Sequence, residues 1–265
     1  MNADREFGFY IETTALRVFQ GNSTPIQVKV ATEVPLTIIA NGIEIATLLT
    51  SPSDLKELVC GYLFTSGFVQ SASEIKNFVC DQQRWVACVE MEHSPDPDLM
   101  RSRLYTPGCG RCAMYTNVNE ISMRTPCNSS LVVSPDSIIS AGNWIAQIST
   151  VFRETGGVHI AALFDAKQGI QYYAEDVARH NAVDKVIGKA LMSCREMSQM
   201  MLVRSGRTSS EILFKAQRSH IPITIARGAP THHAVCLAKD LGITMIGFAR
   251  NEEFTIYANE QRVKI

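Results

Sequence analysis

The fold is decided by residues 200–250, which read MMLVRSGRTSSEILFKAQRSHIPITIARGAPTHHAVCLAKDLGITMIGFAR. Three short apolar runs in this stretch predict buried strands, at 200–203, 222–226 and 243–248. The two longer segments between them predict helices, at 209–219 and 232–241. Strands that alternate with helices in this way indicate an α/β domain with a largely parallel sheet.

The same alternation extends in both directions from this stretch. Ser134-Pro135-Asp136 predicts the start of a helix that runs to Gly156, with an apolar face that includes Ile148 and Phe152. Strands follow at 158–164 and 171–174, then a helix over 177–192 capped by Asp176, and a last strand lies near 254–257. Thr208-x-x-Glu211 has the form of a capping box for the helix that begins there.

The first part of the chain has a different pattern. Residues 7–50 read as β structure, and Asn41-Gly42 predicts a hairpin between strands 34–39 and 43–49. A helix capped by Ser53 and ended near Gly67 precedes two more strands, near 75–80 and 84–91, and a long loop over 93–117. We therefore divide the chain into a smaller N-terminal β-rich region, 1–115, and an α/β domain, 116–265.

Composition narrows the class of protein. The 265 residues carry a net charge of −1 and are 46% hydrophobic, so there is core-forming material but no overall field that favours nucleic acid or an anionic membrane. No apolar run reaches the length of a membrane span, and the first ten residues lack the pattern of a secretory signal. We expect a soluble cytoplasmic protein whose eight cysteines are reduced.

The thiols that stand out are those of Pro107-Gly108-Cys109-Gly110-Arg111-Cys112. Two cysteines at this spacing can share a proton, a metal ion, a disulfide or a transferred sulfur atom, and the arginines at 103 and 111 favour the reactive thiolate. Three other interpretations compete. The pair could be half of a zinc site completed by Cys127 and a histidine, a thioredoxin-like redox pair, or two ordinary loop cysteines.

Two histidines are candidates for a site. His159 is the one polar side chain in an apolar strand. A histidine that is buried in the core with its hydrogen bonds satisfied is as good an interpretation as one that binds a ligand. His180, Asn181, Asp184 and Lys185 fall on the helix face opposite the apolar residues. That face could simply be solvated, but the density of polar groups around Glu175, Asp176 and Arg179 favours a functional role.

Polar, glycine-containing segments follow all three strands of residues 200–250. They are Ser205-Gly206-Arg207, Arg227-Gly228-Ala229-Pro230-Thr231 and the segment from Phe248 to Glu253. In an open α/β sheet these segments meet at the carboxyl edge, where ligands bind. Helix N-termini and arginines together suit phosphate groups, so the sequence predicts a phosphate or nucleotide site there.

These stretches, taken together, resemble one known family. Gly108-Cys109-Gly110-x-Cys112, the segments 155–163 and 175–185, Ser205-Gly206-Arg207, Ala229-Pro230-Thr231 and Gly247-Phe248-x-Arg250 are similar to the motifs of the formate dehydrogenase accessory sulfurtransferases, the FdhD family, and occur in the family's order. Two positions depart from the pattern. Ala178 stands where the family has glycine, and Gly228 stands where it has serine.

The resemblance implies a fold and a function. The main domain would be a three-layer α/β/α sheet similar to the cytidine deaminase fold, and the protein would be a homodimer. Cys109 would accept persulfide sulfur from a cysteine desulfurase, with Cys112 assisting or sharing it. The sulfur would pass to the molybdenum bis(molybdopterin guanine dinucleotide) cofactor, which formate dehydrogenase needs in sulfurated form.

The resemblance also implies which residues hold the cofactor through its guanine nucleotide parts, so that GDP would act as a mimic. The segment after the last buried strand contributes Phe248, Ala249, Arg250, Asn251, Glu252 and Glu253. The other positions are Ser205, Gly206, Arg207, His159, Arg179, His180 and Thr231.

Two other functions are set against this one. A zinc deaminase would need a His-x-Glu motif, and none occurs in the chain, so deamination is rejected. We likewise expect no stoichiometric zinc. A non-catalytic chaperone that binds the molybdenum cofactor would share the nucleotide site but would not need the thiols, and it remains the alternative.

Overall fold

The computed structural model describes residues 8–96, 103–105, 113–115 and 126–265. A six-stranded sheet forms its centre, with the strand order β10-β9-β11-β12-β13-β14. The strands are β9 (His159–Asp165), β10 (Gly169–Asp176), β11 (Met200–Arg204), β12 (Ile223–Ala226), β13 (Thr244–Arg250) and β14 (Glu253–Ala258). The expectation of a largely parallel sheet was wrong for half of these strands. β11, β12 and β13 are parallel, whereas β9, β10 and β14 each run antiparallel to the neighbours they pair with.

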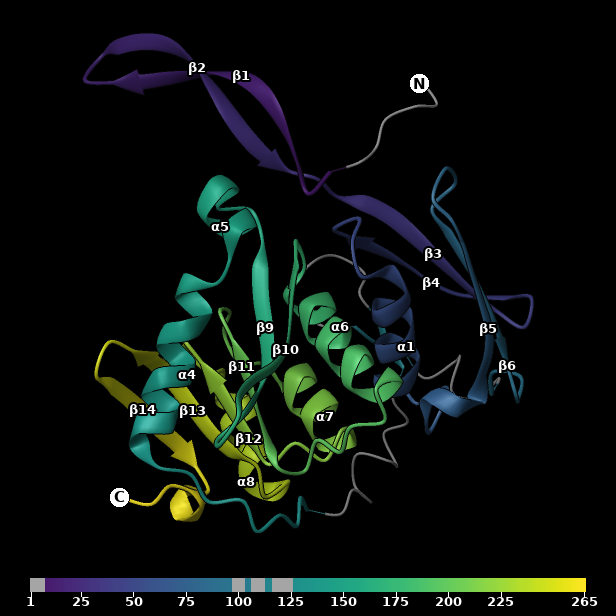
Figure 1. Cartoon of the computed structure of the whole chain (residues 1–265), viewed down its shortest axis with the longest axis vertical. Coiled ribbons are helices and arrows are strands. Elements are labelled where there is room, and N and C mark those ends of the chain that lie inside the picture. Colours follow the sequence, from purple (N-terminus) through teal and green to yellow (C-terminus); the bar gives the residue numbers. More distant parts are fainter. Residues whose placement is uncertain (1–7, 97–102, 106–112, 116–125) are drawn as a thin grey trace.

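Helices cover both faces of this sheet, as the alternating sequence predicts (Figure 1). α4 (Pro135–Gln147) packs on one face through Ile138, Ala141 and Ile145. α6 (Arg179–Met192), α7 (Ser210–Arg218) and α8 (His232–Asp240) pack on the other face. Three layers are therefore present, while the specific likeness to cytidine deaminases stays a prediction.

The single helix expected from Ser134 to Gly156 is two helices. α4 ends at Gln147, and Ser149 caps the short α5 (Thr150–Thr155) by accepting the N–H of Phe152 at 2.8 Å. A hydroxyl that caps a new helix competes with continuation of the old one. The change of direction leaves Phe152 exposed instead of in the core.

The N-terminal part contains the β structure that the sequence predicts. β3 (Val34–Ala40) and β4 (Ile43–Thr50) form a hairpin in which Asn41 and Gly42 both have positive φ, at 48° and 80°. With β5 (Ile75–Asp81) and β6 (Val86–Met91) they form a sheet of order β4-β3-β6-β5. β1 (Tyr10–Phe19) and β2 (Asn22–Ala31) form a separate ribbon that projects from the body of the molecule (Figure 1).

Two local expectations in this region need correction. Asp54, and not Ser53, occupies the N-cap position of α1 (Leu55–Thr65). The segment 93–117 was expected to be a long loop without strands, but β7 (Arg103–Tyr105) pairs with β8 (Ala113–Tyr115) inside it. Short 3-10 helices at Ala72–Glu74 (η1) and Glu260–Arg262 (η2) complete the elements. No helix among the described residues is long and apolar enough to cross a membrane.

α1 and α6 join the two sheets through a close helix contact. A Cβ on Gly61 would overlap the carbonyl oxygen of Asp184, and a Cβ on Gly188 would overlap that of Glu57. One hydrophobic cluster consequently runs from Ile38 in the four-stranded sheet, through both helices, to Leu202 in the six-stranded sheet. The proposed division into 1–115 and 116–265 stays a prediction.

Candidate nucleotide-binding rim

Several of the stretches that resemble the family's motifs meet at one edge of the six-stranded sheet. Because β9 runs antiparallel to β11, the start of β9 lies beside the end of β11, with Arg204 opposite Ala161. The backbone N–H of Ser205 donates to the carbonyl of Ile160 at 3.0 Å, and the N–H of Ile160 donates to the Ser205 hydroxyl at 3.0 Å. We call this edge the rim and define it by His159, Arg179 and the segments 204–209, 227–231 and 247–251.

The three strand-end segments are in direct contact, as the sequence predicts. The N–H of Thr208 donates to the carbonyl of Ala229 at 3.1 Å, and the N–H of Phe248 donates to the carbonyl of Gly228 at 3.4 Å. A Cβ on Gly228 would lie 3.1 Å from the Cα of Arg207. Glycine at 228 therefore permits a close approach that the serine expected there would push apart by a few tenths of an ångström.

Arg204 places a buried positive charge at the rim. Its side chain is 3% exposed and donates to the carbonyls of Gly206 and Arg207 and to the hydroxyl of Thr208, so it holds the shape of the first segment. Its Nε has no hydrogen-bond partner among the described residues. Burial, with a smaller contribution from Arg179, lowers the pKa of Arg204 to about 9, which leaves the guanidinium charged at neutral pH.

This cation has no carboxylate partner among the described residues. A buried charge without a counter-ion is costly, and such groups are found where a ligand supplies the opposite charge. Sequence reasoning missed Arg204. The available signal was a basic residue that ends an otherwise apolar strand, Met-Met-Leu-Val-Arg.

His159 and Arg179 lie over Gly206. A Cβ on Gly206 would be 3.5 Å from Nδ1 of His159 and 3.7 Å from the Cβ of Arg179, so this glycine keeps the rim open between them. Burial, and then the nearby charge of Arg179, lowers the pKa of His159. His159 is thus half-buried and neutral at pH 7, and it can offer one donor or one acceptor to a ligand.

The polar face predicted for α6 is largely buried instead of facing solvent or ligand. Nζ of Lys185 lies 2.6 Å from Asp176, and Nζ of Lys215 lies 2.7 Å from Asp184. Asn181 donates to the carbonyl of Leu49 at 2.8 Å. These groups join α6 to β4, α1 and α7. The 3.6-residue period of the sequence correctly places these polar residues of α6 opposite its apolar face. It cannot show that α1 packs on the polar face and buries it as well.

His180 belongs partly to this buried set. Its Nε2 lies 2.8 Å from Glu211 and 3.5 Å from the Ser209 hydroxyl, and the side chain is about nine-tenths buried. Burial lowers the pKa of His180 more than its hydrogen bond to Glu211 raises it. His180 therefore supports the rim from below, beside the start of α7.

The helix starts at the rim differ in how they are capped. The predicted capping box was wrong, because Ser209 is the N-cap of α7, Thr208 accepts from Arg204, and Glu211 binds His180. Neither α6 nor α7 has a side-chain hydrogen bond at its N-cap. In α8, by contrast, the Thr231 hydroxyl accepts the N–H of Ala234 at 3.3 Å. The first turns of α6 and α7 are thus the ones suited to an anion.

The N-cap of α6 corrects the expectation that Asp176 caps this helix and shows how Ala178 fits there. Asp176 ends β10 and accepts the N–H of Ala178 at 2.8 Å, whereas Ala178 itself occupies the N-cap of α6. Its φ of −107° lies in the extended region that any residue adopts. The alanine that replaces a glycine at this position therefore fits without strain.

The segment from Phe248 to Glu253 forms the end of β13 and the turn into β14. Phe248 has a φ of 53°, an unusual conformation for an aromatic residue, and lies exposed with the guanidinium of Arg250 5.8 Å from its ring. Ala249 is buried against Gly142 of α4, so it supports the segment instead of facing a ligand. Asn143 fixes the turn with two hydrogen bonds to the backbone of Asn251, and Glu252 and Glu253 are exposed.

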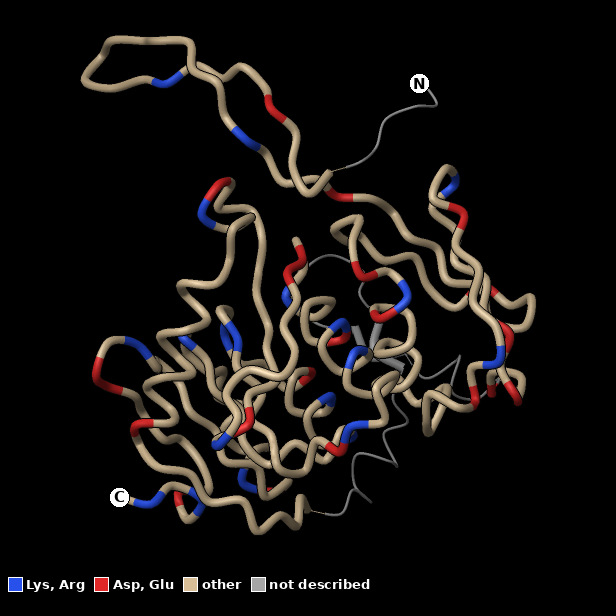
Figure 2. The backbone as a smooth tube through the Cα atoms, in the orientation of Figure 1, with Lys and Arg blue, Asp and Glu red and all other residues tan. Residues whose placement is uncertain are grey.

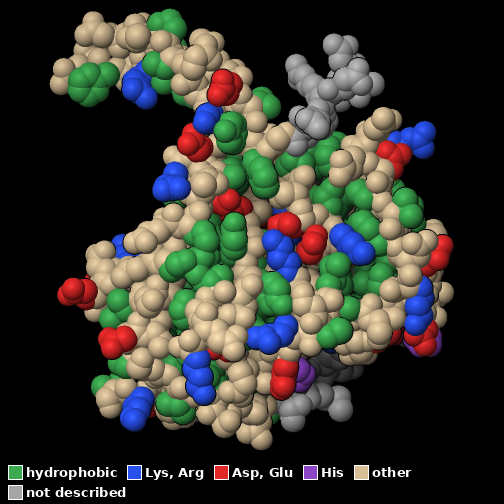
Figure 3. All heavy atoms as spheres, viewed as in Figure 1, with side chains coloured by type: hydrophobic (Ala, Val, Ile, Leu, Met, Phe, Trp, Pro, Cys, Tyr) green, Lys and Arg blue, Asp and Glu red, His purple; other side chains and the backbone are tan. Residues whose placement is uncertain are grey.

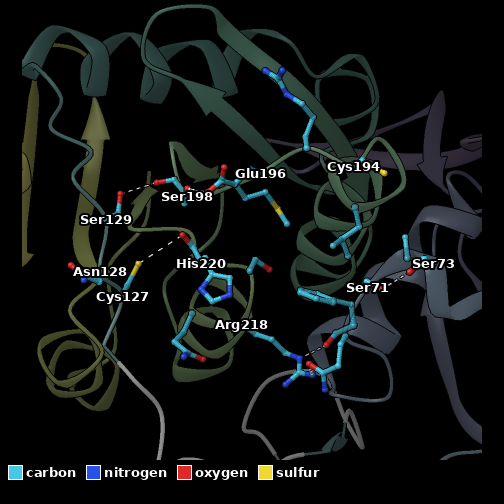
Figure 4. Close-up of a pocket in the computed structure, with 18 residues that line it drawn as sticks. Ser71, Ser73, Cys127, Asn128, Ser129, Cys194, Glu196, Ser198, Arg218 and His220 are labelled. Atoms are coloured by element: carbon cyan, nitrogen blue, oxygen red, sulfur yellow. Dashed lines mark hydrogen bonds between the residues drawn. The ribbon is translucent and has the colours of Figure 1, made fainter. Parts of the chain in front are cut away.

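Cys109 and Cys112 lie outside the described residues. A cavity of ≈ 870 Å³ opens at the opposite, amino-terminal edge of β11 and β12, and Cys127, where the described chain resumes, is part of its wall (Figure 4). The Cys127 thiol lies 3.8 Å from the carbonyl of His220, and burial raises the pKa of Cys127. This thiol is therefore a poor nucleophile. Within the described ranges there is no group of three or more His, Cys, Asp or Glu residues placed to hold a metal ion, and the zinc expectation stays a prediction.

The fold and the rim define a class of protein: an α/β protein that presents helix N-termini and arginine side chains at the carboxyl edge of its parallel strands. A family model described as FdhD/NarQ family matches residues 31–264, and the chain belongs to that family.

Individual relatives agree with this assignment. The chain is 34% identical over 253 residues to a protein of Bacillus subtilis (strain 168) named sulfur carrier protein FdhD, covering 94% of this chain and 95% of that protein. A protein of the same name from Staphylococcus aureus (strain MRSA252) is 36% identical over 236 residues, with 88% of each chain covered. A crystal structure described as a formate dehydrogenase accessory protein from Desulfotalea psychrophila superposes with a TM-score of 0.80 at 26% identity, over 97% of this chain and 100% of that one.

Proposed function

We propose that this chain is a sulfur carrier that serves formate dehydrogenase. The support is its membership of the FdhD/NarQ family together with the names of its relatives, sulfur carrier protein FdhD and formate dehydrogenase accessory protein. Cys109 and Cys112 are the thiols that carry the sulfur. The Cys109 thiolate attacks the outer sulfur of a cysteine desulfurase persulfide, the donor thiolate leaves, and the sulfur remains on Cys109 as a persulfide.

The second step passes this sulfur on. Attack by the Cys112 thiolate on the inner sulfur forms a Cys109–Cys112 disulfide and releases the outer sulfur as sulfide, the form that molybdenum takes as a ligand. A dithiol reductant then restores both thiols. The substrate that receives the sulfur is the molybdenum bis(molybdopterin guanine dinucleotide) cofactor.

The observation that carries the nucleotide part of the proposal is the buried charge of Arg204 at the rim, which has no carboxylate partner among the described residues. In this proposal a diphosphate lies on the first turns of α6 and α7 and supplies a counter-charge to Arg204, and the exposed side chains of Arg207 and Arg250 neutralise the rest. The exposed ring of Phe248 offers a face on which guanine can stack.

Cys109→Ala should abolish activation of formate dehydrogenase while the protein still binds GDP. The thiol is the group that carries the sulfur, and the substitution leaves every residue of the rim unchanged. Mass spectrometry after incubation with a cysteine desulfurase and cysteine should find one added sulfur atom on the wild-type protein and none on the variant. Cys112→Ala should accept the sulfur but release it poorly.

Cys88→Ala, which removes an exposed thiol from β6, is the matched control and should behave as wild type. Full activation of the dehydrogenase by Cys109→Ala would refute sulfur transfer through this thiol and favour the cofactor-binding chaperone.

A further inference from the structure

The cavity at the amino-terminal edge of β11 and β12 lies where α6 and α7 end, whereas both helices begin at the rim. Its volume of ≈ 870 Å³ falls within the range of about 300–1,000 Å³ that is typical of small-molecule sites. Leu191 and Cys194 from the end of α6, and residues 217–220 from the end of α7, form part of its wall. The C-terminus of a helix carries partial negative charge, so this cavity is less suited to phosphate groups than the rim is.

Both helices end in the same backbone motif. In each of them, two N–H groups donate to the carbonyls three and five residues earlier, at 2.8 to 3.0 Å. This Schellman motif places Cys194 and His220 in the left-handed region, with φ of 51° and 56°. Glycine is the usual residue at such a position, although histidine tolerates it better than most. A thiol and an imidazole thus stand where glycine would fit with less strain, and both line the same cavity, which indicates a use for these side chains.

Cys194 is the accessible thiol of this cavity. Its side chain is exposed, whereas Cys127 is only partly exposed and its thiol donates to the carbonyl of His220 (Figure 4). The described part of the chain contains two other exposed cysteines, Cys88 and Cys236, and neither belongs to the wall. Cys194 is therefore the thiol that a molecule bound in the cavity would meet.

The polar groups of the wall carry charges of both signs. The guanidinium of Arg218 donates to the side-chain oxygen of Gln70 at 3.2 Å, and the exposed ring of His220 points into the cavity (Figure 4). Glu196 supplies a carboxylate, which accepts the hydroxyl of Ser198 at 2.6 Å. Ser219 is 2% exposed, and its Oγ has no hydrogen-bond partner among the described residues. A buried hydroxyl without a partner is costly, so a ligand that bonds to it gains affinity.

This wall suits neither a purely apolar nor a purely anionic ligand. Hydrophobic side chains gather on the face that Figure 3 shows, whereas most residues in the wall of the cavity are polar. Acidic and basic residues are interspersed along the chain, so local groups select the ligand instead of a field of one sign (Figure 2). A molecule with a carboxylate, an ammonium group and amides fits this wall. Its carboxylate would lie near Arg218 and His220, and its ammonium group near Glu196.

We propose that the cavity binds a zwitterionic, peptide-like thiol of low molecular mass and that Cys194 forms a mixed disulfide with it. The Cys194 thiolate attacks one sulfur of the ligand in its disulfide form. A new S–S bond forms to Cys194, the S–S bond of the ligand breaks, and the other half of the ligand leaves as a thiolate. Cys194 is oxidised and the ligand disulfide is reduced. The inference does not depend on the proposed sulfur transfer, because it involves neither Cys109 nor Cys112.

The test is the reaction with glutathione disulfide, followed at each cysteine by peptide mass spectrometry. Every sample is the full chain with Cys109→Ser and Cys112→Ser, so that these thiols do not exchange with the adduct. At low concentration the rate at Cys194 should exceed the rates at Cys88 and Cys236 by at least about tenfold, because binding holds the disulfide beside the thiol. The rate at Cys194 should also level off as the concentration rises, whereas the other two rates should rise linearly.

Cys236 is a stringent control for the role of the cavity. Nε2 of His232 lies 3.8 Å from its sulfur, so this thiol has an imidazole beside it but lies outside the cavity. The uncharged bis(2-hydroxyethyl) disulfide gives a second control. It should react at Cys88, Cys194 and Cys236 with rates that agree within about threefold, because it lacks the groups that the wall recognises.

Two variants separate recognition from folding. Glu196→Gln and His220→Gly should each lower the rate of reaction of Cys194 with glutathione disulfide by about fivefold, since each removes one contact with the ligand. His220→Gly should melt no lower than the parent protein, because glycine is favoured at this position. Equal rates at the three cysteines, a rate at Cys194 that does not level off, or the same preference for Cys194 with the uncharged disulfide would overturn the proposal.

Discussion

At the scale of single residues, the buried cations in and near the rim differ in whether a carboxylate lies beside them. Lys185 and Lys215 each have a buried carboxylate within 2.7 Å, so their charges are compensated inside the protein. Burial, and then the nearby charge of Arg179, lowers the pKa of both Arg204 and His159. The first pair of lysines stabilises the fold, whereas the arginines prepare the surface for an anion.

Arg207→Ala and Arg250→Ala should each weaken GDP binding by roughly tenfold to a hundredfold, because each removes a charge-assisted contact with phosphate. Isothermal titration calorimetry measures the effect, and the melting temperature without ligand should change little, since both side chains are exposed. Arg84→Ala, which removes an exposed arginine near the four-stranded sheet, is the control. Unchanged affinity in both rim variants would place the nucleotide elsewhere.

The stability of the protein should fall as the pH drops from about 7 to 5.5, and His180 should account for part of this loss. Burial lowers the pKa of His180 in the folded protein, so the unfolded chain binds more protons below its own pKa of about 6.5. The stabilising difference is therefore present above that pKa and is lost as the pH falls through it. His159 contributes with the same sign.

Urea denaturation of His180→Gln at both pH values should show a smaller pH effect than wild type. His93→Gln alters an exposed histidine and should retain the wild-type difference. Equal pH effects in His180→Gln and wild type would show that this imidazole titrates alike in both states.

At the scale of elements, the sequence predicts strands and helices well wherever one local pattern decides them. The Asn41-Gly42 hairpin and the strands of residues 200–250 are correct because turn chemistry and apolar runs specify them locally. The antiparallel direction of β9 depends instead on pairing with β11, which comes 35 residues or more later in the chain, as the Leu202–Leu163 pair shows. The break at Ser149 was missed because the apolar spacing continues through it.

The contact between α1 and α6 leaves no room for a side chain at the glycines where the two helices meet. Gly61→Ala should destabilise the protein by about 3 kcal/mol, because the added methyl group overlaps the carbonyl of Asp184 and backbone cannot move aside cheaply. Urea denaturation measures this change. Lys56→Ala, at an exposed position of the same helix, should stay within about 0.5 kcal/mol of wild type. A harmless Gly61→Ala would mean that the two helices lie farther apart.

At the scale of the whole molecule, the rim shows what sequence can and cannot locate. The meeting of Ser205-Gly206-Arg207 with Gly228 and Phe248 follows from parallel strands alone, so it was predictable that these segments lie together. The burial of Asp184 and Lys185 was not, because it depends on α1 packing over a second face of α6. Arg204 was missed for a similar reason, since its burial depends on neighbours from β9 and β12.

The two tryptophans report on different parts of the molecule and should unfold together. Trp85 packs on the cluster that joins both sheets, and Trp144 packs on the cluster under α4. Because the six-stranded sheet lies in both clusters, the fluorescence of Trp85→Phe and of Trp144→Phe should give coincident urea transitions. Two separate transitions would indicate that 1–115 and 116–265 are independent folding units.

The arginine charge beneath the rim has one more consequence, which concerns the solution around the protein. The buried charge of Arg204, which has no carboxylate partner among the described residues, should attract small anions from the medium, so sulfate or inorganic phosphate should bind at the rim increasingly as its concentration rises. Such anions stabilise the folded chain and compete with the nucleotide at the same time. The concentration of such anions in solution should therefore raise the stability of the folded protein and lower its apparent affinity for the nucleotide.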